Sequence, residues 1–234
     1  MLELVRYTIA MNSQINLLTL TAASLKEKRY LAELPEYYAL ESVVENNPWH
    51  DHQNVLDHVI KVYAAIEQLL KFEERADSQK TFLHSYFSRT IGNHSKKEIL
   101  CGAALLHDIA KIDTLVTTVD GNSYCPGHEL IGASRVHKFS ERLGLDAVST
   151  GYVEKIVRYH GFISEILNYI LTYGNKQKYF ELFSETVGNV ALELVLHLQA
   201  DIHGCDLERL DKTGFDQRIE ILDWMLDQLI SKYQ

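Results

Sequence analysis

Apolar residues recur every three or four positions along much of this 234-residue chain. After Pro48, the residues that follow this spacing are Val55, Val59, Val62, Ile66 and Leu69. A period of 3.6 residues places such side chains on one face of an α-helix, from which they can pack against a core. Only 12 glycines and 3 prolines are available to interrupt this pattern. The sequence therefore predicts an all-α fold.

The same periodicity gives approximate bounds for each predicted helix. The predicted helices cover residues 12–23, 27–45, 52–73, 96–110, 129–143, 147–160 (or 149–160) and 185–202, followed by a C-terminal helix that carries Ile219, Leu222, Leu226 and Leu229. Residues 74–95 are polar and are predicted to be a connection, with a short helix near 82–87. Residues 114–124 are rich in β-branched side chains around Asp120-Gly121, which favours a short β-hairpin.

Composition limits the classes of protein to which the chain can belong. Hydrophobic residues make up 46% of the sequence, which is enough for one sizeable core. The formal net charge of −9 argues against nucleic acid as the main partner, because phosphate binding usually leaves a basic surface. The three cysteines form no C-x-x-C pair. Their spacing favours a reducing cytosol over a disulfide framework.

Residues 7–25 contain no charged side chain, but their asparagines and threonines make this segment a poor membrane span. The apolar run 15–20 is also short for a secretion signal. We therefore expect a cytoplasmic protein with no membrane partner. The uncharged segment and the amphipathic C-terminal helix could pack against a second copy of the chain in a homo-oligomer, although packing onto the core explains both more simply.

The pair His107-Asp108 lies in an otherwise apolar helical segment, residues 103–110. Burying an imidazole and a carboxylate without partners is costly, and a bound cation would remove that cost. His58 and Asp201 lie on the apolar faces of two other predicted helices. Each has an ordinary alternative, because a lone histidine is more often a packing or surface residue and a lone aspartate is often a helix cap. Together they offer the nitrogen and oxygen donors that Mn, Fe, Mg, Co, Ni or Zn accept.

The order His58, His107-Asp108, Asp201 resembles that of the HD-domain superfamily of metal-dependent phosphohydrolases. The strings that carry the resemblance are VLDHV at 55–59, LLHDIAK at 105–111 and QAD at 199–201. The resemblance implies a single HD domain over residues 1–234, in which a motif region of about 48–204 forms a helical bundle and the terminal helices pack on it.

Within this superfamily, two further strings look most like the HD domains of bacterial tRNA nucleotidyltransferases. They are HQNVLDH at 52–58 and GHELIGA at 127–133. Those enzymes also need a polymerase-like domain before the HD region. Only about fifty residues precede that region here, so we do not expect nucleotidyltransferase activity.

His128 and His160 extend the motif to the order found in HD proteins that hold two metal ions. The resemblance then implies that Asp108 bridges the ions. An ordinary explanation is equally open, in which His128 lies at a helix start beside Gly127 and His160 is a cation at a helix C-terminus. The sequence therefore predicts one or two divalent ions. The other histidines are interpreted mostly as surface or packing residues, with His197 and His203 flanking Asp201.

Lys111 is the best candidate for a substrate phosphate contact, because it lies on the same helix face as His107 and Asp108. A solvated lysine at a helix end is the alternative. Glu129 is a weaker candidate for proton transfer. Arg135 and Arg158 are weaker candidates for phosphate binding, and an exposed helix face explains them equally well.

The resemblance implies hydrolysis by a metal-activated water, with Asp108 at the centre of the site. The expected substrate is a small phosphomonoester or a nucleotide phosphodiester, including cyclic nucleotides. No Gly-rich phosphate loop narrows this choice. The main alternative is a non-catalytic HD module that binds metal or nucleotide for sensing or regulation.

Overall fold

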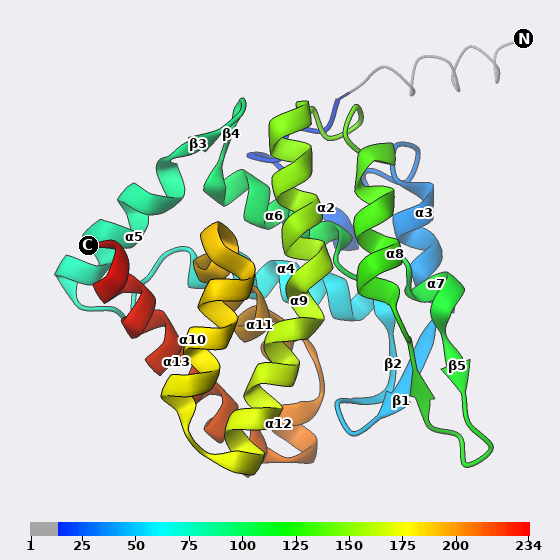
Figure 1. Cartoon of the computed structure of the whole chain (residues 1–234). Helices are drawn as coiled ribbons and strands as arrows, with labels where there is room; N and C mark the ends of the chain where they lie inside the picture. Colours follow the sequence, from blue (N-terminus) through cyan, green and yellow to red (C-terminus); the bar gives the residue numbers. More distant parts are fainter. Residues whose placement is uncertain (1–13) are drawn as a thin grey trace, which may run out of the picture.

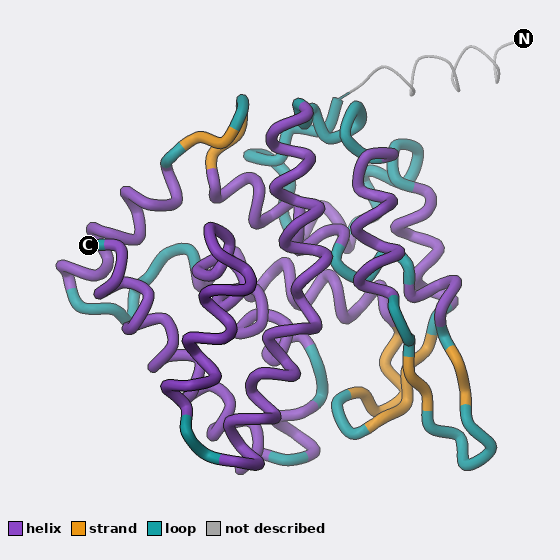
Figure 2. Tube along the Cα trace, in the orientation of Figure 1, coloured by secondary structure: helices purple, strands orange, loops and turns teal. Residues whose placement is uncertain are grey.

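The computed structural model describes residues 14–234, and helices form most of this part of the chain (Figures 1 and 2). Its α-helices are α2 (Ala22–Lys26), α3 (Pro35–Tyr38), α4 (Val55–Leu69), α5 (Asp77–Ser88), α6 (Lys96–Leu106), α7 (Lys111–Thr114), α8 (His128–Arg135), α9 (Ala147–Tyr173), α10 (Lys176–Val187), α11 (Ala191–Gly204), α12 (Leu207–Leu210) and α13 (Lys212–Tyr233). Three short 3₁₀ segments are Ala39–Ser42, Val136–Lys138 and Gly188–Val190. The prediction of an all-α fold is confirmed.

Within residues 14–234, six short strands form three antiparallel hairpins. The pairs are β1 (Val44–Asn47) with β2 (His50–Asn54), β3 (Thr90–Ile91) with β4 (His94–Ser95), and β5 (Val116–Thr117) with β6 (Ser123–Tyr124). The β5–β6 hairpin confirms the prediction for residues 114–124. The β1–β2 and β5–β6 hairpins lie side by side at one end of the molecule (Figure 1), where the Asn46 amide donates to Ser123 Oγ at 2.7 Å.

Helix α11 lies at the centre of the fold. All of its residues are buried except Asp201 and His203, as expected for a helix whose apolar residues surround its axis. It packs most extensively on α4. A Cβ atom at Gly204 would lie only 2.5 Å from Val62 Cγ2 and 3.0 Å from the Val62 backbone nitrogen, so glycine permits this close approach. One cluster of buried residues extends from Ile15 to Ile230.

Side-chain caps define where several helices begin. Asn54 accepts a hydrogen bond from the Asp57 amide at 2.8 Å and starts α4. Helix α4 therefore begins three residues later than the predicted helix 52–73, because the residues before Asn54 pair in β2. Ser95 and Glu98 form a capping box that starts α6 where predicted.

Several predicted bounds were wrong. In place of long helices at 12–23 and 27–45, the structure has α2, α3, a 3₁₀ turn and β1, with residues 12 and 13 outside the described part. Helix α9 continues to Tyr173 instead of ending at His160. The predicted helix 185–202 is divided at Gly188, whose φ of 58° ends α10. Helix α8 ends at Arg135, before the predicted residue 143.

Within residues 14–234, no helix is both long and apolar enough to cross a membrane. The cysteines Cys101, Cys125 and Cys205 are all unpaired.

Candidate metal centre

Four of the predicted site residues converge from three helices. His58 lies on α4, His107 and Asp108 directly follow α6, and Asp201 lies in the last turn of α11. The His58 Nε2 atom is 2.9 Å from Asp201 Oδ1 and 3.5 Å from Asp108 Oδ2. The His107 Nε2 atom is 3.2 Å from Asp108 Oδ2 and 3.8 Å from Asp201 Oδ1. These side chains, far apart in sequence, therefore face one another.

A second group of side chains shares Asp108 with the first. His128 is the first residue of α8, and His160 lies in the middle of α9. Their Nε2 atoms are 3.1 Å apart, and they lie 3.3 and 3.8 Å from Asp108 Oδ1, respectively. Asp108 thus turns Oδ2 toward His58 and His107, and Oδ1 toward His128 and His160. We call these six residues, including Asp201, the His/Asp cluster.

Three imidazoles of the cluster are oriented in the same way. The Nδ1 atoms of His107, His128 and His160 lie 2.6 to 2.9 Å from the backbone carbonyl oxygen three residues earlier. A carbonyl oxygen can only accept, so Nδ1 carries the proton in each bond. The Nε2 atoms of the neutral rings then present lone pairs toward Asp108. This is the orientation in which a histidine that binds a metal ion is usually held.

The cluster leaves buried polar atoms without hydrogen-bond partners. Among the described residues, these atoms include His58 Nδ1, His107 Nε2 and Asp108 Oδ2. The contacts of Asp108 Oδ2 are close ion pairs without hydrogen-bond geometry. Two facing Nε2 lone pairs, as in His128 and His160, also repel unless a proton or a cation lies between them. Imidazole nitrogens and carboxylate oxygens are suitable ligands for a divalent transition metal, so the donor set fits such an ion.

The charges of the cluster change its protonation equilibria. Burial opposes ionisation of Asp108, but the neighbouring charges of His107 and Lys111 hold its pKa well below the usual range. Burial likewise opposes ionisation of Asp201, but the hydrogen bond and charge of His58 lower its pKa. Both carboxylates are therefore ionised at neutral pH and available as ligands.

Burial and the neighbouring carboxylates shift the pKa values of the imidazoles in opposite directions. Burial would lower the pKa of His107 and His128, but Asp108 raises both above the ordinary value. The pKa of His160 is well below the ordinary value, because the ring is buried and lies beside other imidazoles. In the metal-free protein, protons on His107 and His128 therefore offset part of the negative charge that a bound cation would offset.

Lys111 is buried, so the alternative of a solvated lysine is wrong. Its Nζ atom lies 2.7 Å from Glu45 Oε2 and 3.0 Å from Asp108 Oδ2. Burial opposes the charge of Lys111, but these two carboxylates raise its pKa above the ordinary value. Glu45 was predicted to end the helix 27–45 and was given no role, whereas it is a buried residue of β1.

Two further histidines lie beside the cluster: His197, which the sequence placed next to Asp201, and His50, for which the sequence suggested no role. His50 is buried, its Nδ1 atom lies 2.6 Å from Gln53 Oε1, and its ring packs edge-on against His58. His197 is fully buried, with its ring centroid 4.8 Å from that of His107. Both of its ring nitrogens lack a hydrogen-bond partner among the described residues, and burial lowers its pKa to about 3. Its position one turn before Asp201 was the available sequence signal.

The weaker candidates lie around or outside the cluster. The Oε2 atom of Glu129 is 3.5 Å from His128 Nδ1, at the edge of the cluster. Arg135 instead pairs with the exposed Asp113. Arg158 is exposed on α9, two residues before His160, and residues two apart point about 200° away from each other around a helix. The structure brings neither arginine into the cluster.

A cavity of about 490 Å³ adjoins the cluster beneath the two neighbouring hairpins. The site residues that line it are Glu45, His50, Lys111 and His128. The hairpin residues that line it are Asn47, Pro48, Trp49, Asn122, Ser123, Tyr124 and Cys125. This volume is suitable for a small organic ligand.

The fold is a bundle of helices, and its buried His/Asp cluster offers the kinds of ligand atoms that a divalent metal ion binds. A family model described as the HD domain matches residues 55–187, more than half of the chain. The chain belongs to the HD domain family, a superfamily of metal-dependent phosphohydrolases. The match includes five residues of the cluster and ends before Asp201.

Two curated relatives share part of this chain. Each is a bifunctional uridylyltransferase/uridylyl-removing enzyme. The protein from Novosphingobium aromaticivorans is 28% identical over 131 residues, which are 56% of this chain and 12% of the relative. The protein from Cereibacter sphaeroides is 25% identical over 135 residues, which are 58% of this chain and 13% of the relative. The similarity thus covers only a small part of these much longer proteins.

Proposed function

We propose that this chain is a metal-dependent phosphohydrolase that cleaves a small phosphomonoester or a nucleotide phosphodiester, including cyclic nucleotides. One observation carries the proposal: Asp108 turns each of its two carboxylate oxygens toward a separate pair of imidazoles. A carboxylate in this position is suited to join two ligand sets. The family match supports the same reaction class.

We infer that His58, His107, Asp108 and Asp201 would hold one divalent ion, and that Asp108 with His128 and His160 would hold a second. Two compact groups of ligand atoms, one with His58, His107 and Asp108 and the other with Asp108, His128 and His160, support this division. When bound, the metal lowers the pKa of a coordinated water and offsets the charge on phosphate oxygens.

The residues that line the adjoining cavity would position the substrate. Lys111 has three N–H donors, of which two are accounted for by Glu45 and Asp108. The remaining donor would bind a phosphate oxygen in the cavity that Lys111 lines. Glu129, at the edge of the cluster, is the candidate for proton transfer. We assign no role to Arg135 or Arg158, because neither joins the cluster.

The relatives help to choose substrates for a first test. Their names include uridylyl removal, which places nucleotidyl esters beside generic phosphoesters in the substrate panel. We would assay the purified chain on such a panel with Mn, Mg, Co, Ni and Fe, each added to metal-free protein. The proposal predicts metal-dependent hydrolysis of at least one phosphoester. Protein that binds metal but hydrolyses nothing in the panel would support the non-catalytic HD module instead.

Two variants separate the roles of metal and substrate residues. Asp108→Ala should abolish hydrolysis, because it removes the carboxylate shared by both ligand groups. Lys111→Met should retain metal and lose about tenfold or more in kcat/KM, mainly through KM, because one charge-assisted hydrogen bond to the phosphate is lost. Circular dichroism of both variants checks that they fold. Full activity in Asp108→Ala would contradict the assignment.

A further inference from the structure

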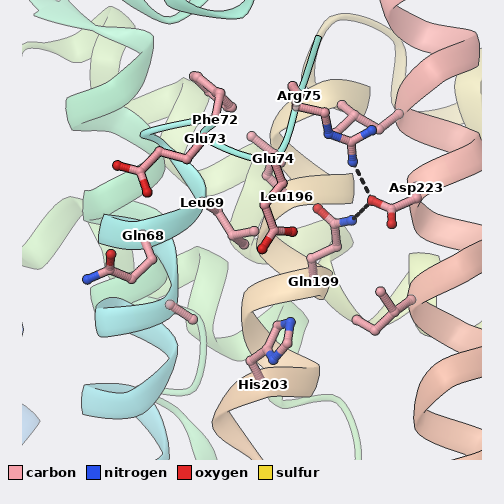
Figure 3. Close-up of a pocket in the computed structure, with 13 residues that line it drawn as sticks. Gln68, Leu69, Phe72, Glu73, Glu74, Arg75, Leu196, Gln199, His203 and Asp223 are labelled. Atoms are coloured by element: carbon pink, nitrogen blue, oxygen red, sulfur yellow. Dashed lines mark hydrogen bonds and ion pairs between the residues drawn. The ribbon is translucent and has the colours of Figure 1, made fainter. Parts of the chain in front are cut away.

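A second cavity has a volume of about 450 Å³. Figure 3 shows the side chains that line it. It is enclosed by the end of α4, the following turn, α11 and α13. From α11 it is lined by Leu196, Gln199 and His203. His197 and Asp201 on the same helix instead face the cluster. The cavity is therefore separated from the candidate metal centre by the body of α11.

The floor of this cavity is apolar and its rim is acidic. The apolar lining residues are Ala65, Leu69, Phe72, Leu196, Ile219 and Leu226. The rim contains three carboxylates, from Glu73, Glu74 and Asp223, and a single guanidinium, from Arg75. The cavity has a volume in the range of small-molecule sites. Its lining favours a ligand with an apolar body and a positive charge.

The one arginine of the rim is already engaged. Arg75 pairs with Asp223 through Nη2 (Figure 3). Its Nη1 atom lies 3.2 Å from Asp227 Oδ1. Gln79 also donates to Asp227 Oδ1, at 3.0 Å. Two carboxylates thus offset the charge of Arg75. An anion entering the cavity would have to compete with both of them.

Gln199 supplies an independent sign that a ligand donor is missing. The residue is only 3% exposed, and its Nε2 atom donates to Asp223 Oδ1 at 2.9 Å. An ionised carboxylate can only accept, so this bond fixes the amide orientation and turns Oε1 away from Asp223. Oε1 is buried and has no hydrogen-bond partner among the described residues. A buried carbonyl oxygen of this kind needs an N–H or O–H donor.

We propose that this cavity binds a small organic cation, a protonated primary amine carried on an apolar body. The apolar body would lie against Leu196, Leu69 and Leu226, and the ammonium would lie beside Asp223 and supply the donor that Gln199 Oε1 lacks. Asp223 Oδ1 already accepts from Arg75 and Gln199, so the ammonium would bind the other carboxylate oxygen together with Gln199 Oε1. This site does not depend on the chemistry of the His/Asp cluster.

Three probes of similar shape but different charge test the proposal. They are 4-fluorobenzylamine, 4-fluorobenzyl alcohol and 4-fluorobenzoate, each titrated with the full chain and followed by fluorine NMR. We expect saturable binding of the amine with a Kd of about 10 mM or tighter, as is usual for a fragment of this size. The alcohol should bind about fivefold more weakly, and the benzoate should not bind.

Variants place the binding in this cavity. Asp223→Asn and Gln199→Leu should each weaken amine binding about fivefold, at the lower end for a charge-assisted hydrogen bond because the rim is partly exposed. Asp216→Asn, an exposed carboxylate on the same helix outside the cavity, should leave the Kd within about twofold. No amine binding, equal binding of the benzoate, or unchanged binding in both cavity variants would overturn the proposal.

Discussion

Helix α11 carries two buried ionisable clusters that differ in how their polar atoms are satisfied. In its first turn, Glu193 lies with Lys96, Tyr86 and Tyr152, which we call the Lys96 cluster. In its last two turns, His197 and Asp201 face the His/Asp cluster. Both clusters are enclosed by apolar helices. The two clusters differ in whether their buried polar atoms all have hydrogen-bond partners.

The Lys96 cluster is satisfied by its own members. Lys96 Nζ donates to Glu193 Oε1 and Tyr152 Oη at 2.5 Å and to Tyr86 Oη at 2.9 Å, which uses all three of its donors. Glu193 Oε2 accepts from Tyr86 at 3.2 Å. Such a network can fix the packing of four elements without any ligand. The His/Asp cluster, in contrast, keeps buried lone pairs without donors, which indicates a place for a cation.

The comparison predicts that removing one charge from the Lys96 cluster affects stability most. Glu193→Gln should lower the free energy of unfolding by about 3–5 kcal/mol, because it leaves the Lys96 ammonium buried without a counter-charge. Urea unfolding measures this change. The double variant Lys96→Met/Glu193→Leu should recover most of the loss, since neither charge then remains. A change below about 1 kcal/mol in Glu193→Gln would remove the distinction between the clusters.

The matched change at the other end of α11 should affect function instead. In Asp201→Asn, the amide oxygen can still accept from His58, so the metal-free protein should lose no more than about 1 kcal/mol of stability. A neutral amide is a poor ligand for a divalent transition metal, so we expect a loss of metal-dependent hydrolysis of about 100-fold or more. Steady-state kinetics with unfolding curves on chelated protein test both parts. Wild-type turnover in Asp201→Asn would contradict the assignment of this residue.

A smaller difference between the two clusters concerns the free energy of unfolding at acidic pH. Burial lowers the pKa of His197 to about 3, whereas an unfolded histidine has a pKa of about 6.5. Its contribution to stability is therefore complete above pH 6.5 and is lost as the pH falls toward 3, because the unfolded chain takes up the proton first. One proton corresponds to a slope of about 1.4 kcal/mol per pH unit.

His197→Gln should reduce the slope of stability against pH by about this amount between roughly pH 4 and 6. His160, whose pKa is also lowered, should keep part of the slope in the variant. Urea unfolding of chelated protein at several pH values gives both slopes. Equal slopes for wild type and variant would show that His197 does not stay neutral in the fold.

The spacing of residues in the sequence predicted those features of the site that depend on local helical periodicity. The helical spacing around His58, His107 and Asp201 places these residues on inward faces, and the structure brings them together. Glu45 could not be found in this way, because it reaches Lys111 through a hairpin whose pairing is not encoded by helical spacing. Long-range pairings of this kind leave little local signal.

The predicted end of α9 failed for a related reason. The helix was predicted to end at His160, yet α9 continues through the next residue, Gly161, for another three turns. A Cβ atom at Gly161 would collide with the Glu129 carboxylate of α8. The glycine leaves room for this carboxylate, a contact between two helices that only the tertiary structure reveals.

Calorimetric titration of metal-free protein with Mn²⁺ determines whether the His/Asp cluster binds a divalent ion. The unsatisfied atoms of the His/Asp cluster predict saturable binding of one or two ions by the wild type. Glu193→Gln, which changes only the Lys96 cluster, should bind with the same stoichiometry, and Asp108→Ala should show no saturable binding. An absence of binding to the wild type, or equal binding to wild type and Asp108→Ala, would show that the cluster is not a metal site.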